Sequence, residues 1–241
     1  MINHVSRKEN DMSVTLFISD LHVSPENPAM TNCFVKFLAR EASRADALYI
    51  LGDLFEAWIG DDVDDSFTRT IVNNLRNWPK PLYLMQGNRD FLMGEIFAQK
   101  TNAKLLSDPT VIDLYGVATL VSHGDLLCTE DKAYLRFRKI VRMKWLQKLF
   151  LLLPLKFRLN IAEKLRAQSS SHVKTLSPEI MDVTPKAVSD WLKLYKVSRI
   201  IHGHTHRPAI TPDRIVLPMW HDRGGALVAS SDKSVDLVYF E

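Results

Sequence analysis

The chain of 241 residues is 46% hydrophobic and 24% charged, the composition of a folded protein with one large domain or one domain with an insertion. Its two cysteines, Cys33 and Cys128, form no spacing pattern, which argues against a disulfide framework or a thiolate zinc site and fits buried thiols in a reducing cytosol. Residues 1–12 are polar and the apolar run at 149–155 is short, so we expect neither a secretory signal nor a membrane-spanning helix.

Short apolar segments alternate with amphipathic ones along the chain. We expect strands, in chain order, over residues 14–19, 47–51, 82–85, 117–122, 199–201, 226–230 and 235–240. One helix is expected to be capped by Thr31 and to run to about residue 44, and another to be capped by Ser66 and to run to about residue 78. This alternation predicts an α/β fold with helices over the sheets.

Residues 131–181 differ from the rest because they lack strand signals and are rich in helix formers. We interpret them as a helical insertion, a lid over a core made of residues 1–130 and 182–241. A kink or loop is expected at residues 169–171, and an apolar face is expected to combine Trp145, Leu149, Leu152 and Leu153. The wider aliphatic cluster that we expect to hold apolar substrate groups is Leu146, Leu149, Phe150, Leu152, Leu153 and Leu155.

The formal charge of the chain is unevenly distributed. Residues 132–174 contain 12 lysines and arginines and one acid, Glu163, which gives this segment +11. Because the whole chain carries +3, the remainder carries −8. This asymmetry predicts a basic surface for anionic partners beside an acidic body that binds cations.

Five short blocks place Asp, Asn or His near the end of an expected strand, and in four of them a glycine stands beside these residues. One such block alone is usually a turn, but the ends of strands in α/β folds meet at one crevice, so five blocks indicate a common site. The blocks are Asp20-Leu21-His22, Gly52-Asp53-Leu54-Phe55-Glu56, Gly87-Asn88-Arg89-Asp90, His123-Gly124-Asp125 and Gly203-His204-Thr205-His206.

The residue types in these blocks favour a metal centre. Residues i and i+2 of an extended chain share a face, so Asp20 and His22 can bind one ion, and His204 and His206 can approach a centre from another side. Oxygen and imidazole donors suit Mn²⁺, Mg²⁺, Fe²⁺ or Zn²⁺. Asp53 is our choice for a carboxylate that bridges two ions about 3.5–4 Å apart, with a hydroxide between them as nucleophile.

In this order, the blocks resemble the calcineurin-like metallophosphoesterase superfamily over most of the chain. The resemblance implies two β-sheets packed face to face with helices outside. It implies that one metal is held by Asp20, His22, Asp53 and His206, and the other by Asp53, Asn88, His123 and His204. Asp90 and Asp125 are then expected to orient ligands or loops, whereas His202 falls outside the matching pattern.

Further blocks at residues 55–62, 87–92, 123–129, 180–183 and 201–208 resemble the members of this superfamily that act in lipid A biosynthesis. That resemblance implies two Mn²⁺ ions, water attack at the α-phosphorus of a UDP-linked diacylated sugar, and an insertion that holds the acylated sugar. It implies substrate contacts at Asn88, Arg89, Asp131, Ser169 and His204. Where polar contacts are expected downstream, the chain has Val173 and Leu176, so we expect Lys174 to supply the charge.

Asn88, Arg89 and Asp53 are the residues expected to act in catalysis. Many members of the superfamily carry histidine where this chain has Arg89. A guanidinium stays protonated and cannot deliver a proton, but it can clamp phosphate charge. Arginine therefore fits diphosphate cleavage, in which the phosphate leaving group needs little protonation.

A basic and apolar insertion suits a molecule with two acyl chains and a diphosphate, and it also suits binding at an anionic membrane surface. Together with the resemblance, this implies a lipid-linked UDP-sugar substrate and peripheral binding to the cytoplasmic face of a bacterial inner membrane. We expect a monomer that binds no nucleic acid. Another phosphoesterase, such as a nucleotide phosphodiesterase or a protein phosphatase, would share the metals without needing this insertion. A non-catalytic module would be expected to lose ligands, and all seven candidates are present.

Overall fold

The computed structural model describes residues 12–41, 43–173 and 180–241, with the side chains of residues 170–173 left aside. Its helices are α1 (Pro28–Glu41), α2 (Ser66–Arg76), α3 (Glu95–Lys100), η1 (Asp125–Leu127), α4 (Lys132–Val141), α5 (Lys144–Leu151), α6 (Leu155–Val173) and α7 (Pro185–Tyr195). Its strands are β1 (Val14–Ile18), β2 (Ala47–Leu51), β3 (Leu82–Met85), β4 (Lys104–Leu106), β5 (Thr110–Leu114), β6 (Val117–Ser122), β7 (Arg199–His202), β8 (Ala209–Ile210), β9 (Arg214–Val216), β10 (Gly224–Ser230) and β11 (Val235–Phe240).

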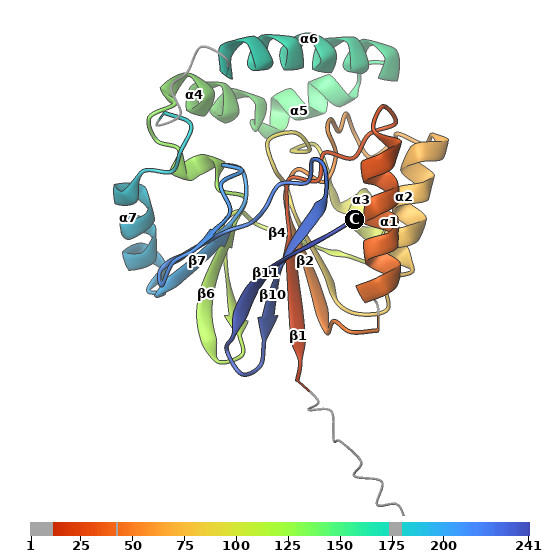
Figure 1. Ribbon diagram of the computed structural model, residues 1–241. Coiled ribbons are helices and arrows are strands. Elements are labelled where there is room, and N and C mark those ends of the chain that lie inside the picture. The colour runs from red at the N-terminus through yellow and green to blue at the C-terminus, as the bar shows by residue number, and fades with distance from the viewer. Residues whose placement is uncertain (1–11, 42, 174–179) are drawn as a thin grey trace, which may run out of the picture.

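The strands form two sheets that pack face to face. A six-stranded sheet has the order β11-β10-β1-β2-β3-β4. Strands β1 to β4 run parallel to one another, and β10 runs antiparallel to both of its neighbours, β1 and β11. A five-stranded sheet has the order β5-β6-β7-β9-β8, with β6, β7 and β9 parallel. Helices α1, α2 and α3 cover the first sheet, and α7 lies beside the second (Figure 1).

Side-chain alternation along the strands creates separate hydrophobic layers. In β1, Leu16 and Ile18 pack with the residues of α1 and α2, whereas Phe17 points the other way and joins the core between the sheets. That inter-sheet core also contains Leu51, Met85, Val121, Ile201, Ile215 and Leu227. A third cluster packs α7 on β6 and β7. The predicted α/β sandwich with flanking helices is confirmed, and Cys33 and Cys128 are free and buried as expected.

Several predicted helix boundaries are wrong for identifiable reasons. Helix α1 begins at Pro28, because the side chain of Asn27 accepts from the backbone N–H of Met30, so Thr31 is not its cap. Helix α2 is capped by Asp65, whose carboxylate accepts from Thr68 N at 2.7 Å. The kink or loop expected at residues 169–171 does not interrupt α6, which continues to Val173 because serine costs a helix little.

Helices α4, α5 and α6 form a layer over one end of the sheets (Figure 1), here called the α4–α6 layer. Arginines of this layer contact the protein beneath it. Arg138 Nε lies 2.5 Å from Asp125, Arg142 donates to the carbonyl of Gly87 at 2.7 Å, and Arg158 donates to the carbonyl of Ile59 at 2.7 Å. Some of the basic side chains therefore hold the layer in place. The charge count had predicted only a basic surface for anionic partners. Within the described ranges, no helix has the length and apolar character needed to cross a bilayer.

Candidate active site

The predicted ligands come together because each follows the carboxyl end of a strand. Asp20 and His22 follow β1, Asp53 follows β2 and Asn88 follows β3 in the first sheet; His123 follows β6, and His204 and His206 follow β7, in the second. The two sheets therefore deliver donors to one place, beneath the α4–α6 layer.

The backbone at this place is unusual. Positive φ angles, which are uncommon for residues with side chains, occur at five of the seven predicted ligands. Such conformations cost about 1–3 kcal/mol each and persist where the surrounding structure holds them, typically at functional sites. The five residues are Asp20, His22, Asp53, His204 and His206.

Two glycines allow the loops to approach the ligands closely. A Cβ atom on Gly87 would lie 2.1 Å from Asp53 Oδ1, and one on Gly203 would lie 2.3 Å from Asp20 Oδ2. Both distances are far below a van der Waals contact, so only glycine fits at these positions.

The first donor group consists of Asp20, His22 and His206, whose candidate ligand atoms lie within 4.8 Å of one another. Asp20 Oδ1 is buried, lies 3.3 Å from His206 Nε2, and has no hydrogen-bond partner among the described residues. Its Oδ2 instead accepts from Ser19 Oγ at 2.6 Å and from His204 N at 2.9 Å. One carboxylate oxygen thus fixes the loop and leaves the other for a cation, which fits a metal ligand.

The second donor group contains Asp20, Asp53 and His123, again within 4.8 Å. Asn88 Oδ1 lies 2.9 Å from both His123 Nε2 and His204 Nδ1, so the amide oxygen and the two imidazoles converge. These oxygen and nitrogen donors suit the divalent ions considered above.

Asp53 belongs to the second group and also approaches His22 of the first group. Its Oδ2 is 3.9 Å from His22 Nε2 and its Oδ1 is 3.9 Å from His123 Nε2. The carboxylate is nearly fully buried, with 2% exposure, and Oδ1 accepts from the backbone N–H of Arg89 at 2.8 Å. This is the placement that a bridging carboxylate needs.

The electrostatics of the cluster also fit cation binding. Burial opposes charge on Asp20, but contact with His206 and nearby imidazoles hold its pKa below the usual range. Burial would lower the pKa of His123, but the negative charges of Asp53 and Asp20 outweigh it and raise that pKa to about 9. A proton on His123 therefore offsets the carboxylates, a role that a divalent cation can take over.

Asp90 and Asp125 hold the loops around the ligands, as the resemblance implied. Asp90 accepts from Gly87 N at 2.7 Å and from Leu54 N at 2.8 Å, which ties the loop after β2 to the loop after β3. Burial and the charge of Asp53 raise the pKa of Asp90 to about 6. Asp125 accepts from the hydroxyl of Tyr134 and from Arg138, both on α4.

A cavity of about 530 Å³ lies between the ligand loops and the α4–α6 layer. Of the predicted substrate contacts, Asn88, Arg89, Asp131 and Ser169 line it, His204 does not, and Lys174 is outside the described residues. Its apolar wall includes Trp58, Ile59, Phe91, Leu92, Phe137, Leu146, Phe150, Ile161 and Leu165.

The prediction that the wider aliphatic cluster holds apolar substrate groups is partly wrong. Leu146 and Phe150 of α5 line the cavity, whereas Leu149 of the cluster does not and, like Trp145, is more than half exposed. Leu152, which follows α5, is 80% exposed. Both faces of α5 are apolar, so periodicity could not tell which one the body would cover.

Sequence reasoning also missed Glu56, Tyr134, Arg138 and Arg166 as site residues. Glu56 and Arg166 line the cavity and form an ion pair at 2.6 Å. Glu56 ends the block Gly52-Asp53-Leu54-Phe55-Glu56, so its position close to Asp53 in the sequence could have indicated that it belongs to the site. The arginines contributed only to a charge count, which carries no information about their partners.

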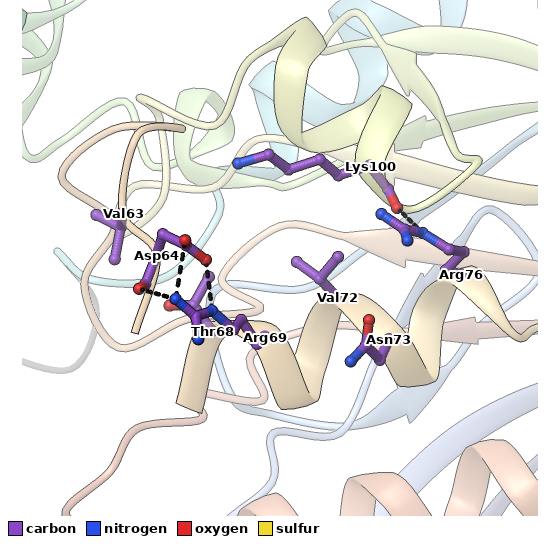
Figure 2. A pocket seen from close by; sticks show the side chains of 8 residues that line it. All are labelled: Val63, Asp64, Thr68, Arg69, Val72, Asn73, Arg76 and Lys100. Carbon is purple, nitrogen blue, oxygen red and sulfur yellow. Dashed lines mark hydrogen bonds and ion pairs between the residues drawn. The ribbon is translucent and has the colours of Figure 1, made fainter. Parts of the chain in front are cut away.

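A smaller cavity of about 160 Å³ lies along α2 and beside the end of α3. Its charged groups already pair with one another: Arg69 with Asp64, and Arg76 with the carbonyl of Lys100 (Figure 2). These contacts join neighbouring elements, and none of the predicted ligands lines this cavity.

The family model for calcineurin-like phosphoesterases matches residues 14–208. The chain therefore belongs to the calcineurin-like phosphoesterase family. It is 48% identical over 240 residues to "UDP-2,3-diacylglucosamine hydrolase" of Coxiella burnetii (strain RSA 331 / Henzerling II), covering 95% of this chain and 99% of that protein. It is 51% identical over 227 residues to the protein of the same name from Aeromonas salmonicida (strain A449), covering 90% and 89%.

Proposed function

We propose that this protein hydrolyses the diphosphate of UDP-2,3-diacylglucosamine by water attack at the α-phosphorus, giving UMP and 2,3-diacylglucosamine 1-phosphate (lipid X) in lipid A biosynthesis. The name shared by its relatives supports the substrate, and membership of the phosphoesterase family supports metal-dependent hydrolysis. The observation that carries the proposal is the lining of the larger cavity, which joins Asn88 and Arg89 to an apolar wall. A substrate with both a diphosphate and acyl chains needs both features.

In this proposal, Asp20, His22, Asp53 and His206 hold one divalent ion and Asp53, Asn88, His123 and His204 hold the other. When bound, the ions lower the pKa of water and offset charge on the phosphate. Arg89 and Asn88 both line the cavity, and the Arg89 guanidinium clamps the diphosphate. Asp131 and Ser169 orient the sugar from the α4–α6 layer, and Lys174 adds positive charge.

We further propose that both ions are Mn²⁺. The support is the donor set, in which carboxylate, amide and imidazole groups suit Mn²⁺. Measuring turnover of chelator-treated enzyme with Mn²⁺, Mg²⁺ or Zn²⁺ restored separately tests the choice. Greatest recovery with Mn²⁺ is expected, and greater recovery with another ion would overturn it.

Residues 131–181 act, in this proposal, as a lid on a core of residues 1–130 and 182–241, in a protein that works as a monomer. The support for a lid is that residues of the α4–α6 layer line one side of the cavity and residues of the ligand loops line the other. We also propose peripheral binding to the anionic cytoplasmic face of the inner membrane. Exposed Trp145, Leu152 and Phe157 lie among lysines on this layer, a composition that suits such a surface.

The substrate assignment is tested by comparing kcat/KM for UDP-2,3-diacylglucosamine with that for UDP-glucosamine and for a small chromogenic phosphodiester. Each buried methylene contributes roughly 0.8 kcal/mol, so the acylated substrate should be favoured by orders of magnitude. Equal values for the acylated and deacylated nucleotides would contradict the lipid assignment and favour another phosphoesterase activity.

A further inference from the structure

Glu56 contacts groups from three parts of the site. Its Oε2 lies 3.2 Å from Nδ1 of His22, a predicted metal ligand. Its Oε1 lies 2.6 Å from Nη2 of Arg166 on α6 and 3.8 Å from Nη1 of Arg89. One carboxylate therefore faces the metal centre with one oxygen and the α4–α6 layer with the other.

The contact with His22 bears on metal binding. An imidazole ligand offers one unprotonated nitrogen, and the partner of its other nitrogen decides which one that is. Nε2 of His22 faces Asp53 at 3.9 Å, while Nδ1 faces Glu56. Nδ1 is buried and forms no hydrogen bond of standard geometry among the described residues, but the Glu56 carboxylate 3.2 Å away attracts an N–H at this position, which favours Nε2 as the ligand atom.

The contact with Arg166 helps to attach helix α6 to the rest of the protein. Nearer its start, α6 is fixed by Arg158, which is 2% exposed and donates to the carbonyls of Leu153 and Ile59 and to Asp62. The side chain of Arg166 is 43% exposed, and its ion pair with Glu56 is a weaker attachment. The first half of α6 is therefore attached through the buried Arg158, and its second half is attached through the more exposed ion pair of Arg166.

We propose that Glu56 is a positioning residue that couples the metal centre to α6. It keeps His22 in the metal-binding tautomer and draws Arg166 and Arg89 to the cavity mouth. The substrate diphosphate competes with Glu56 for these two guanidinium groups, so substrate binding exchanges an internal ion pair for contacts with the substrate. This inference rests on the metal centre of the proposed function.

Three substitutions distinguish the contact with His22 from the contact with Arg166. Glu56→Ala removes both of these and the contact with Arg89, whereas Glu56→Gln keeps an oxygen that can accept from His22 but loses the negative charge that attracts the arginines. Arg166→Gln removes the contact with α6 alone. Glu163→Gln, at an exposed acid on the same helix, is the matched control.

The experiment measures Mn²⁺ affinity by equilibrium dialysis and amide hydrogen exchange over residues 155–169, on full-length protein without substrate. Glu56→Ala should weaken Mn²⁺ binding about 10–100-fold, while Glu56→Gln and Arg166→Gln should stay within about threefold of wild type. All three should speed exchange in the second half of α6, and the control should change neither readout. Circular dichroism establishes that each variant is folded.

The outcomes are distinguishable. If wild-type protein binds no Mn²⁺, the proposed metal centre is wrong and the coupling falls with it. If wild type binds Mn²⁺ but Glu56→Ala binds it equally well, the coupling alone is wrong. Unchanged exchange in both Glu56 variants would also overturn it.

Discussion

The backbone N–H of Arg89 donates to Oδ1 of Asp53 at 2.8 Å, while the Arg89 side chain lines the cavity. The same residue thus holds the Asp53 carboxylate with its main chain and contributes to the cavity lining. Side-chain substitution at Arg89 leaves the first contact intact, so the two functions can be tested independently.

Replacing Asp53 with alanine should remove the carboxylate between the two donor groups. Turnover should fall by roughly three orders of magnitude or more, because neither ion keeps its shared ligand. Added Mn²⁺ should restore activity to chelated wild type but not to Asp53→Ala. Near wild-type activity of this variant in metal-replete buffer would rule out the bridging assignment.

Replacing Arg89 with alanine should lower kcat about 100–1,000-fold, the usual effect of losing a group that stabilises transition-state charge. Bound metal, measured by mass spectrometry, should match wild type because the Arg89 main chain still contacts Asp53. Arg89→His should not recover the reaction, since the proposed function is a charge clamp. Full recovery with histidine would show that proton delivery matters instead.

Leu146 and Phe150 line the cavity from α5, whereas Leu149 is 54% exposed on the other face. Changing Leu146 and Phe150 to serine should reduce the preference for acylated over deacylated substrate by at least about tenfold. Hydrolysis of a small phosphodiester should be spared. Leu149→Ser is the matched control in detergent solution, and an equal loss in that variant would contradict this account of the cavity.

Gly87→Ala should displace Asp53, because the added Cβ would lie 2.1 Å from its carboxylate oxygen. We expect a stability loss of about 1–3 kcal/mol together with weakened metal binding. Gly116→Ala is the control: its φ is +79°, but nothing lies within 4 Å of the new Cβ. It should cost about 1 kcal/mol through backbone strain and leave metal binding unchanged. Denaturant titration and Mn²⁺ dialysis measure the two effects.

The metal-free protein should respond to pH through His123. Its folded pKa of about 9 lies above the unfolded value of 6.5, so its contribution to stability is complete below the unfolded value and is lost as pH rises through the folded one. A metal ion must displace this proton, so Mn²⁺ affinity should rise up to about tenfold per pH unit from about pH 6.5 to about pH 8.5. Calorimetry in two buffers of different ionisation enthalpy counts the released proton. Proton-independent binding would contradict this assignment.

Much of the site could be predicted because chain geometry constrains it. Parallel strands end at a common edge, so Asp20, Asp53 and Asn88 had to lie near one another once β1, β2 and β3 were identified. The ligand types then indicated metal chemistry. Their roles as ligands remain predictions for the experiments above.

Other features depend on contacts between distant residues and could not be predicted. The positive φ of His22 and His206 is imposed by the surrounding loops, and no local pattern encodes it. Arg158 and Arg166 pair with Asp62 and Glu56, about a hundred residues earlier in the chain, which a charge count cannot reveal. Helices α3 and α7 were also not predicted from the sequence.

The proposed reaction places the attacking water oxygen on the α-phosphorus of UDP-2,3-diacylglucosamine. This can be tested by letting the Mn²⁺-loaded protein react with this substrate in ¹⁸O-labelled water and analysing both products by mass spectrometry. We expect one labelled oxygen in UMP and none in 2,3-diacylglucosamine 1-phosphate. Label in the lipid phosphate, or no cleavage of the diphosphate, would contradict it.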